Sequence, residues 1–386
     1  MKDSRTKPFL LSIFAYFTVG CMVLTANTVL DSIITEFSWS DSQGGLIITC
    51  MSMGNLFMSI VGNLLMEKTG RRGAMVLYSA MMAASYGLFA LMPNPGTFYP
   101  LMLIAGLAWG GINSLVNTVV TEMYHGNASK LNIMHACYAI GAVTFPLLVG
   151  FMTKSGLSLR VPAGLVAGLG VLLLVLSALT KLPERVRQVD ESGKSSDVQF
   201  WKELGFYLAV ITLFMYVGVE SAASSWLSGY LKLVNPFFEQ VPAQTMVSLM
   251  WAMLLVGRLF FAGISARLDR RMLLVGLSAG FLIGVTGLVL FAANTILAIL
   301  FTAILGLSMS AIYATAVANS ARYVEGSAVA PGIIFGAGGL GSAIIPFVAG
   351  LVSDAAGLRM GMASLCLFLL ILLAASILNL RERARG

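Results

Sequence analysis

One carboxyl group stands out in the apolar stretch 216–230, which reads YVGVESAASSWLSGY. Tyr216, Glu220 and Ser224 recur every four residues, with Trp226 close by. Residues four apart share one face of a helix, so these side chains form a polar ladder. A carboxyl group among apolar residues favours its protonated form and can take up and release a proton. We therefore select Glu220 as a candidate ion-coupling group; the alternative is a structural acid paired with a neighbour on its own helix.

Polar side chains repeat in a similar way in two earlier stretches. Trp109, Asn113 and Asn117 follow each other at intervals of four, and His135 and Tyr138 are three apart. Amides and hydroxyls supply the paired donors and acceptors that a sugar needs, and aromatic rings can cover its C–H face. Such ladders can equally be hydrogen bonds between membrane helices. For Asn113 and Asn117 we favour a ligand cavity, whereas His135 can be a proton relay, a ligand donor or a packing group.

The composition indicates the elements that carry these side chains. The chain has 386 residues, of which 58% are hydrophobic and 11% are charged. A soluble domain carries about 25% charged residues. Apolar runs of about 20 residues, long enough to cross a bilayer core of about 30 Å, recur along the sequence. They do not alternate polar and apolar residues as barrel strands do, so we predict an all-α integral membrane protein.

Twelve transmembrane helices are expected. They lie at about 8–31, 43–66, 73–92, 98–122, 131–153, 161–180, 204–231, 243–265, 272–292, 297–320, 329–353 and 360–380. The first lacks the small-residue cleavage site of a secretory signal, and we expect it to be retained.

Lys and Arg fall unevenly between these spans. With the N-terminus inside, 19 of the 24 lie on the cytoplasmic side, as the positive-inside rule requires. Both termini are therefore expected in the cytoplasm, in an inner or plasma membrane. No basic stripe with interleaved aromatic residues suggests nucleic acid. The four cysteines lie singly within spans, without metal or redox spacing.

The sequence divides into two similar halves. The only long hydrophilic stretch is 182–203, which we interpret as a cytoplasmic linker between bundles at 1–181 and 204–386. GAVTFPLLVG at 141–150 and GSAIIPFVAG at 341–350 share glycines and a proline at an offset of 200 residues. The same offset relates Arg71 to Arg271. We predict two pseudo-symmetric bundles of six helices each.

The loop NLLMEKTGRR after the second span resembles the signature loop of the major facilitator superfamily. Glu67, Gly70, Arg71 and Arg72 match its acid, glycine and basic pair, while Asn63 replaces a glycine. In the second half, Arg267 stands in place of the acid. The resemblance implies the major facilitator fold over the whole chain and a gating or structural role for the four matching residues. The alternative is an ordinary positive-inside loop.

Several stretches are similar to the fucose and glucose/galactose type of sugar:cation symporters. They are ANTVLDSI in the first span, LNIMHACYAIGA in the fifth, YVG in the seventh, GRLF in the eighth and GLVSDAAG in the eleventh. The resemblance gives an ion-coupling role to Asp31 and places Asn27 beside it. The fourth-helix acid of the fucose type falls on Asn113, whereas the seventh helix carries Glu220. Compared with the fucose type, the acid therefore lies on the seventh helix, in the second half, instead of on the fourth helix, in the first half.

Position along the helices separates the two acids. Asp31 lies about 35 Å from Pro8 at 1.5 Å per residue, which reaches the external boundary. Glu220 lies about 21 Å into its helix by the same measure, in the outer half of the core. An intramembrane acid is costly and usually functional, so we prefer Glu220 for coupling and Asp31 for positioning. Arg258 is expected near the cytoplasmic third, as a structural or gating residue.

We therefore predict a secondary transporter, not an enzyme, that moves a sugar together with H⁺ or Na⁺. Its ligand contacts are expected to include Trp109 and Trp226, stacked on the sugar, and Tyr313. No cofactor beyond the ion is implied, and no nucleotide-binding loop is present. We expect a monomer whose partners are the substrate and the bilayer. The alternatives are a proton-coupled exporter of amphipathic compounds, favoured by the 22 methionines, and a membrane sensor or membrane-embedded enzyme.

Overall fold

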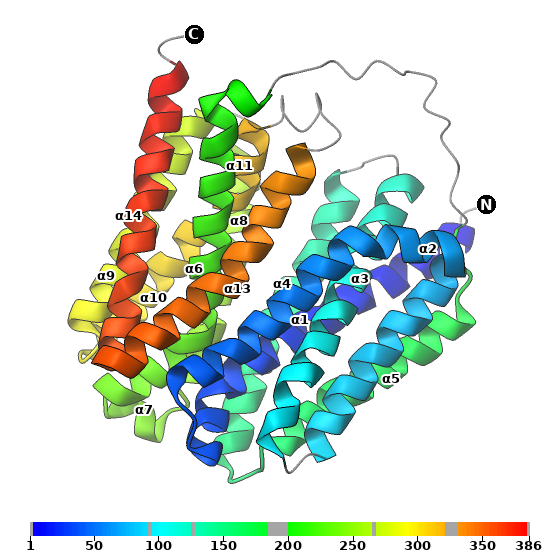
Figure 1. Cartoon of the computed structure of the whole chain (residues 1–386), viewed down its shortest axis with the longest axis horizontal. Coiled ribbons are helices and arrows are strands. Elements are labelled where there is room, and N and C mark those ends of the chain that lie inside the picture. Colours follow the sequence, from blue (N-terminus) through cyan, green and yellow to red (C-terminus); the bar gives the residue numbers. More distant parts are fainter. Residues whose placement is uncertain are drawn as a thin grey trace. The chain divides into compact units, whose positions relative to one another are not determined.

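The computed structural model describes residues 3–91, 94–124, 128–183, 200–264, 268–320 and 330–383 (Figure 1). All regular structure within these ranges is helical. Most of the expected linker 182–203 lies outside the described residues, as do Arg267 and the side chains of Asn63 and Glu67.

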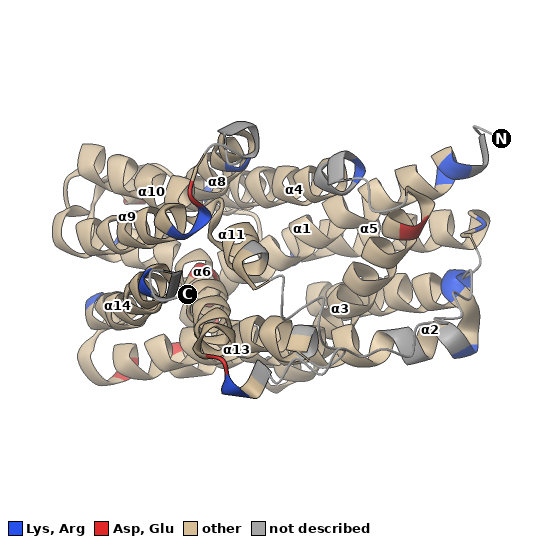
Figure 2. Cartoon of the chain, turned by 90° about the horizontal axis from the view of Figure 1, so that it is seen from above, with Lys and Arg blue, Asp and Glu red and all other residues tan. Residues whose placement is uncertain are grey.

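The long helices follow the expected spans closely. They are α1 (Asp3–Phe37), α2 (Asp41–Leu91), α3 (Phe98–Met123), α4 (Ala128–Lys154), α5 (Arg160–Leu179), α6 (Leu204–Val234), α8 (Gln244–Ile264), α9 (Arg270–Phe291), α10 (Thr295–Met309), α11 (Ile312–Asn319), α13 (Ala330–Ala356) and α14 (Leu358–Arg383), with the short α7 (Phe237–Gln240). Twelve segments of the described chain are long and apolar enough to cross a membrane, which confirms the predicted number. The charged residues lie mainly towards helix ends (Figure 2).

Two helical spans are interrupted for local reasons. Gly70 has φ 70° and ψ 162°, a conformation that favours glycine, and it divides α2 into two spans. The tenth span stops at Met309 and resumes at Ile312, so α10 and α11 together make one crossing. A helix that stops inside a span leaves carbonyl groups without intrahelical partners. These groups need donors from elsewhere.

The chain forms two compact units. The first comprises Met1–Trp39 and Leu46–Arg187, and the second comprises Ser40–Gly45 and Gln188–Gly386. Residues 40–45, which we expected in the first bundle, group with the second unit. Within that unit the Asp354 carboxylate accepts hydrogen bonds from the backbone N–H groups of Asp41 (2.6 Å) and Ser42 (3.1 Å). These are the first residues of α2, so a side chain from α13 caps this helix. Ser353 also donates to the Asp41 carboxylate.

Glycines permit close helix packing at matching places in each unit. A methyl group on Gly141 of α4 would meet the Phe17 carbonyl oxygen of α1, and one on Gly341 of α13 would meet the Phe214 carbonyl oxygen of α6. Small residues let membrane helices approach closely in this way. The predicted offset of 200 residues therefore relates two equivalent helix pairs, α1 with α4 and α6 with α13.

Side-chain contacts repeat at nearly the same offset, 199 residues for one pair of serines and 200 for one asparagine. Ser79 and Ser177 place their hydroxyl oxygens 3.5 Å apart, and Ser278 and Ser376 place theirs 2.9 Å apart. Asn94 and Asn294 each accept a backbone N–H at the start of a helical segment. These pairs lie within separate units, so the pseudo-symmetry of the two halves extends from the sequence to individual hydrogen bonds.

Candidate functional site

A cluster of polar and aromatic side chains lies within the first unit. It consists of Tyr16 from α1, Asn113 and Asn117 from α3, and His135 and Tyr138 from α4, and we call it the amide cluster. The Tyr16 hydroxyl donates to Asn113 Oδ1 and accepts from Asn117 Nδ2. The Tyr16 ring lies 5.0 Å from that of His135 and 6.4 Å from that of Tyr138, both edge to face.

Four members of the amide cluster were selected from their spacing, but Tyr16 was missed. Tyr16 is buried, the two asparagines and Tyr138 are half-buried, and His135 is exposed. No repeat in the sequence links Tyr16 to a residue 97 positions later in the chain. The cluster contains no carboxylate, lysine or arginine. It can bind hydroxyl groups by hydrogen bonds, with His135 as its one side chain that titrates near neutral pH.

Trp109, Asn27 and Asp31 are the other first-unit candidates for ligand or ion binding. Trp109 is half-buried one turn before Asn113 on α3, and Asn27 is buried on α1. Asp31 is half-buried one turn after Asn27.

The surroundings of Asp31 differ from the expectation. The first span was expected to end there, but α1 continues to Phe37, about 9 Å further at 1.5 Å per residue. An aromatic group follows: Trp39 stacks on Tyr99 at 5.3 Å, and Phe37 lies 5.5 Å from Phe98. Aromatic residues of this kind mark membrane–water interfaces. Asp31 therefore lies six residues before the end of α1, and this aromatic group follows it in the chain.

A second cluster, around Glu220, lies within the second unit. The Glu220 carboxyl group hydrogen-bonds with the Tyr216 hydroxyl one turn earlier on α6 and interacts electrostatically with Arg258 of α8. Tyr313 of α11 also interacts electrostatically with Glu220, and its ring lies 6.5 Å from that of Tyr216. We call these four residues the carboxyl cluster. Glu220 and Arg258 were selected separately, as coupling and gating candidates, and the interaction between them was not predicted.

Tyr216 connects the carboxyl cluster to the interrupted tenth span. Its hydroxyl donates to the carbonyl oxygen of Met309, the last residue of α10, at 3.1 Å. A hydroxyl has one proton, so Tyr216 cannot donate to Met309 and to an ionised Glu220 at once. When Glu220 is protonated it can donate to Tyr216, and Tyr216 then keeps its bond to Met309. The direction of this hydrogen bond depends on whether Glu220 holds a proton.

The other candidate residues of α6, Ser224 and Trp226, are buried and donate hydrogen bonds to backbone carbonyl oxygens. Ser224 is buried and donates to the Glu220 carbonyl oxygen at 2.9 Å. Trp226 is 4% exposed, and its Nε1 donates to the Pro346 carbonyl oxygen at 3.1 Å. Proline cannot donate to the carbonyl four residues earlier, and the Ser221 hydroxyl contacts that carbonyl, at Ser342, at 3.5 Å. In this structure Trp226 presents almost no open surface to a ligand, and it stays outside our proposed site.

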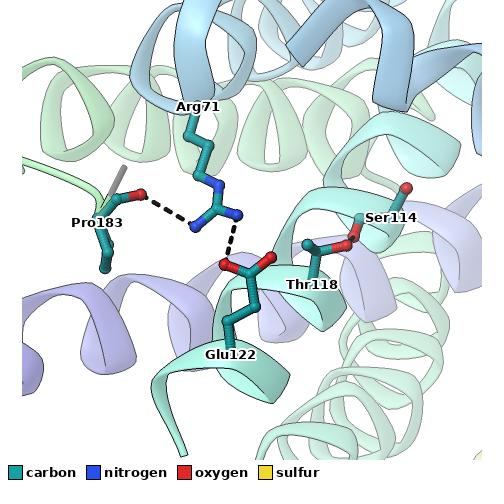
Figure 3. A network of polar contacts seen from close by, with 5 residues as sticks. All are labelled: Arg71, Ser114, Thr118, Glu122 and Pro183. Carbon is teal, nitrogen blue, oxygen red and sulfur yellow. Dashed lines mark hydrogen bonds and ion pairs between the residues drawn. The ribbon is translucent and has the colours of Figure 1, made fainter. Parts of the chain in front are cut away.

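The signature loop makes an ion pair that was not predicted. Arg71 is nearly buried, and its guanidinium donates to Glu122 Oε2 at 2.6 Å and to the Pro183 carbonyl oxygen at 3.0 Å (Figure 3). This is the one ion pair within 4.0 Å among the described side chains. Arg72 donates to the Ala178 carbonyl oxygen. The acid partner thus comes from α3, 51 residues later in the chain, where no motif identifies it.

The second half lacks this ion pair among the residues described. Arg271, equivalent to Arg71, donates to the Asn379 carbonyl oxygen at 2.8 Å. The helix that carries it begins with Asp269, whose carboxylate accepts the backbone N–H groups of Arg271 and Met272. An acid is present here, but it caps α9.

A family model described as the Major Facilitator Superfamily matches residues 12–238, which is more than half of the chain. The chain belongs to the Major Facilitator Superfamily. The predicted family and the fold class of twelve transmembrane helices are confirmed. The protein is an integral membrane transporter of this superfamily.

Relatives cover most of this superfamily member. The glucose/mannose transporter GlcP of Bacillus subtilis (strain 168) is 23% identical over 351 residues, covering 87% of this chain and 85% of GlcP. Protein TsgA of Escherichia coli O6:K15:H31 (strain 536 / UPEC) is 25% identical over 323 residues, covering 81% and 79%. The likeness extends to both halves.

Solved structures share the fold at lower identity. A D-xylose-proton symporter has a TM-score of 0.80 and 13% identity, with 97% of each chain covered. The nucleoside transporter NupG has a TM-score of 0.70 and 13% identity, covering 97% of this chain and 98% of its own. These likenesses concern the fold alone.

Proposed function

We propose that this transporter carries a neutral sugar across the membrane together with protons. The observation that carries this proposal is that the two clusters differ in charge. The amide cluster offers amides, hydroxyls and an imidazole. The carboxyl cluster contains the charged side chains of Glu220 and Arg258, which interact electrostatically. The amide cluster binds hydroxyl groups, and Glu220 carries the coupled ion. The name of the relative GlcP, a glucose/mannose transporter, supports a hexose as the ligand.

A proton suits the carboxyl cluster better than sodium. Arg258 already provides a positive charge near Glu220, and a sodium ion would add a second one beside it. A sodium ion would also need several oxygen ligands, whereas the residues that interact with Glu220 are Tyr216, Tyr313 and Arg258. Protonation changes the charge of Glu220 without a coordination shell. The Tyr216 hydroxyl can then donate its hydrogen bond to the Met309 carbonyl oxygen.

The remaining features of the proposal follow from the sequence and the family. Transporters of this kind bind their ligand near the middle of the membrane and expose it to each side in turn. We assign both termini to the cytoplasm from the distribution of Lys and Arg. The protein acts as a monomer, with Asp31 and Asn27 as positioning residues and the Arg71–Glu122 pair as a structural support of the loop at Gly70.

Gradient-driven uptake tests the proposal. The full-length protein is reconstituted in liposomes, and accumulation of D-glucose is measured with an imposed proton gradient, with an imposed sodium gradient and with neither. We expect accumulation above the external concentration with the proton gradient alone. Accumulation with the sodium gradient alone would overturn the choice of ion. If D-glucose, D-mannose and D-xylose are not transported under any gradient, the proposed sugar class is wrong.

A further inference from the structure

We infer that the hydrogen bonds among Tyr16, Asn113 and Asn117 fix the two amides of the amide cluster in opposite orientations, so that Asn113 offers a ligand a hydrogen-bond donor and Asn117 offers an acceptor. The first unit then recognises two nearby groups of a neutral ligand, one accepting and one donating. This inference rests on the proposed function and specifies which hydrogen-bonding groups of the sugar the protein recognises.

The orientation of Asn117 follows from its partners on α3. Its Nδ2 lies 2.9 Å from the backbone carbonyl oxygen of Asn113 and 3.0 Å from Asn113 Oδ1. Both of these atoms are acceptors, so the nitrogen end of the Asn117 amide must face them. A flipped amide would place three oxygens together. Asn117 Oδ1 therefore points away, and no other described residue hydrogen-bonds with it.

The orientation of Asn113 follows from that of Asn117. Asn113 Oδ1 accepts from Asn117 Nδ2 and from the Tyr16 hydroxyl, which itself accepts from Asn117 Nδ2. The Tyr16 proton is directed to Asn113, and the remaining atom of that amide, Nδ2, has no partner among the described residues. Tyr16 is 3% exposed. It acts as a positioning residue through the two half-buried amides.

The pair of free amide atoms defines the chemistry of the ligand. Asn113 and Asn117 are four residues apart on one helix, which places their Cβ atoms about 5–6 Å apart. A sugar hydroxyl both donates and accepts, so two neighbouring hydroxyls can satisfy Asn113 Nδ2 and Asn117 Oδ1 together. A ligand with acceptors only would leave Asn117 Oδ1 unpaired on closure, which is costly in a desolvated site. An anionic or cationic group would find no opposite formal charge among the two amides and Tyr16.

Deoxy and deoxyfluoro analogues of D-glucose test the inference. A fluorine keeps a weak acceptor and removes the donor, whereas a deoxy position removes both. Binding of each analogue, substituted at positions 2, 3, 4 or 6, is measured by calorimetry with the purified full-length protein. We expect one position where the fluoro analogue binds near D-glucose but the deoxy analogue binds about tenfold more weakly. At a second position, both analogues should lose about tenfold.

The variants assign these positions. Asn113→Ala should abolish the difference between fluoro and deoxy analogues at the first position, and Asn117→Ala should remove the loss at the second. Tyr16→Phe should reduce both effects at once. Tyr86→Phe is the matched control, because Tyr86 is buried in the same unit and its hydroxyl donates to the Met22 carbonyl oxygen at 2.6 Å. It should change thermal stability without changing the analogue pattern.

The outcomes separate this inference from the proposed function. If the wild type binds none of D-glucose, D-mannose and D-xylose, both are overturned. If it binds D-glucose but the analogue pattern is the same in wild type and Tyr16→Phe, only the inference is overturned. A Tyr16→Phe variant that weakens all analogues equally, with a fall in thermal stability like that of Tyr86→Phe, assigns Tyr16 a structural role and also overturns it.

Discussion

The two intramembrane acids differ in their neighbours. Glu220 has Tyr216 as a hydrogen-bond partner and Arg258 as an opposite charge, whereas Asp31 lies one turn from Asn27 and six residues before the end of α1. Because α1 continues six residues beyond Asp31, the end of the helix does not by itself place Asp31 at the membrane boundary. The choice between the acids now rests on the Arg258 counter-charge at Glu220.

Neutralising each acid in turn tests this choice. Glu220→Gln imitates the protonated carboxyl group, so we expect it to abolish uphill accumulation of sugar and to preserve counterflow, which needs no net proton movement. Asp31→Asn should lower both activities only in part. Proton-driven accumulation and counterflow in liposomes measure the two effects. If accumulation survives in Glu220→Gln and disappears in Asp31→Asn, the coupling role belongs to Asp31.

Tyr216 should matter for coupling beyond its effect on stability. Tyr216→Phe removes the hydroxyl that serves Met309 and Glu220, so we expect a several-fold fall in accumulation with counterflow retained. Tyr230→Phe is the control on the same helix, since the Tyr230 hydroxyl donates only to backbone carbonyls, at Leu288 and Val289. Each variant should lose about 1 kcal/mol of stability, the typical value of one hydrogen bond. Equal accumulation in both variants would contradict the coupling role.

Sequence periodicity was sufficient for residues that share a helix face and insufficient for partners on other helices. The spacing of Asn113, Asn117, His135 and Tyr138 selected them as candidate ligand contacts, and the structure brings them together around Tyr16. Their role in binding stays a prediction. Tyr16 and Glu122 were missed because each is defined by a partner far away in the chain. Trp226 was selected as a ligand contact because it adjoins the ladder, but its direction depends on α13.

At the scale of elements, glycines set how closely helices approach. Gly141→Ala and Gly341→Ala place a methyl group against a backbone carbonyl that cannot move aside, at Phe17 and Phe214. We expect each to cost about 1–3 kcal/mol, as overpacking does. Thermal unfolding in detergent measures the change.

Two other glycines provide the matched controls. A methyl group on Gly168 of α5 or Gly276 of α9 would meet no atom within 4 Å. Alanine is favoured over glycine inside a helix by about 0.8–1.0 kcal/mol, so Gly168→Ala and Gly276→Ala should leave stability unchanged or raise it. If all four variants behave alike, the close approach of these helices is not limited by the glycines.

At the scale of the whole molecule, composition and charge predicted the number of spans, and the offset of 200 residues predicted two related halves. Which helices pair within each half was not predicted, because α1 with α4 and α6 with α13 are distant in sequence and meet through glycines on both helices. The assignment of Ser40–Gly45 to the second unit was also missed. It depends on contacts with residues of α13 that lie about 300 positions later in the chain, Asp354 among them.

Orientation in the membrane can be measured directly. Cys21, Cys50, Cys137 and Cys366 are first replaced by serine or alanine, and single cysteines are then introduced by Lys154→Cys and Lys194→Cys. The positive-inside rule places Lys194 in the cytoplasm and Lys154 outside. A membrane-impermeant maleimide should therefore label position 154 in intact cells and position 194 only after permeabilisation. The reverse pattern would invert our topology.

The cap at the start of α2 has a consequence for genetics. Asp354 binds the N–H groups of Asp41 and Ser42, which every residue except proline possesses. Side-chain replacements at Ser42 keep the two backbone bonds but remove the hydrogen bond between the Ser42 side chain and Asp354, and those at Asp41 remove its bond from Ser353. A mutational scan should therefore be more sensitive at position 354 than at position 42. The backbone part of this contact would escape detection by co-varying pairs of residues, because any residue except proline at positions 41 and 42 can supply it.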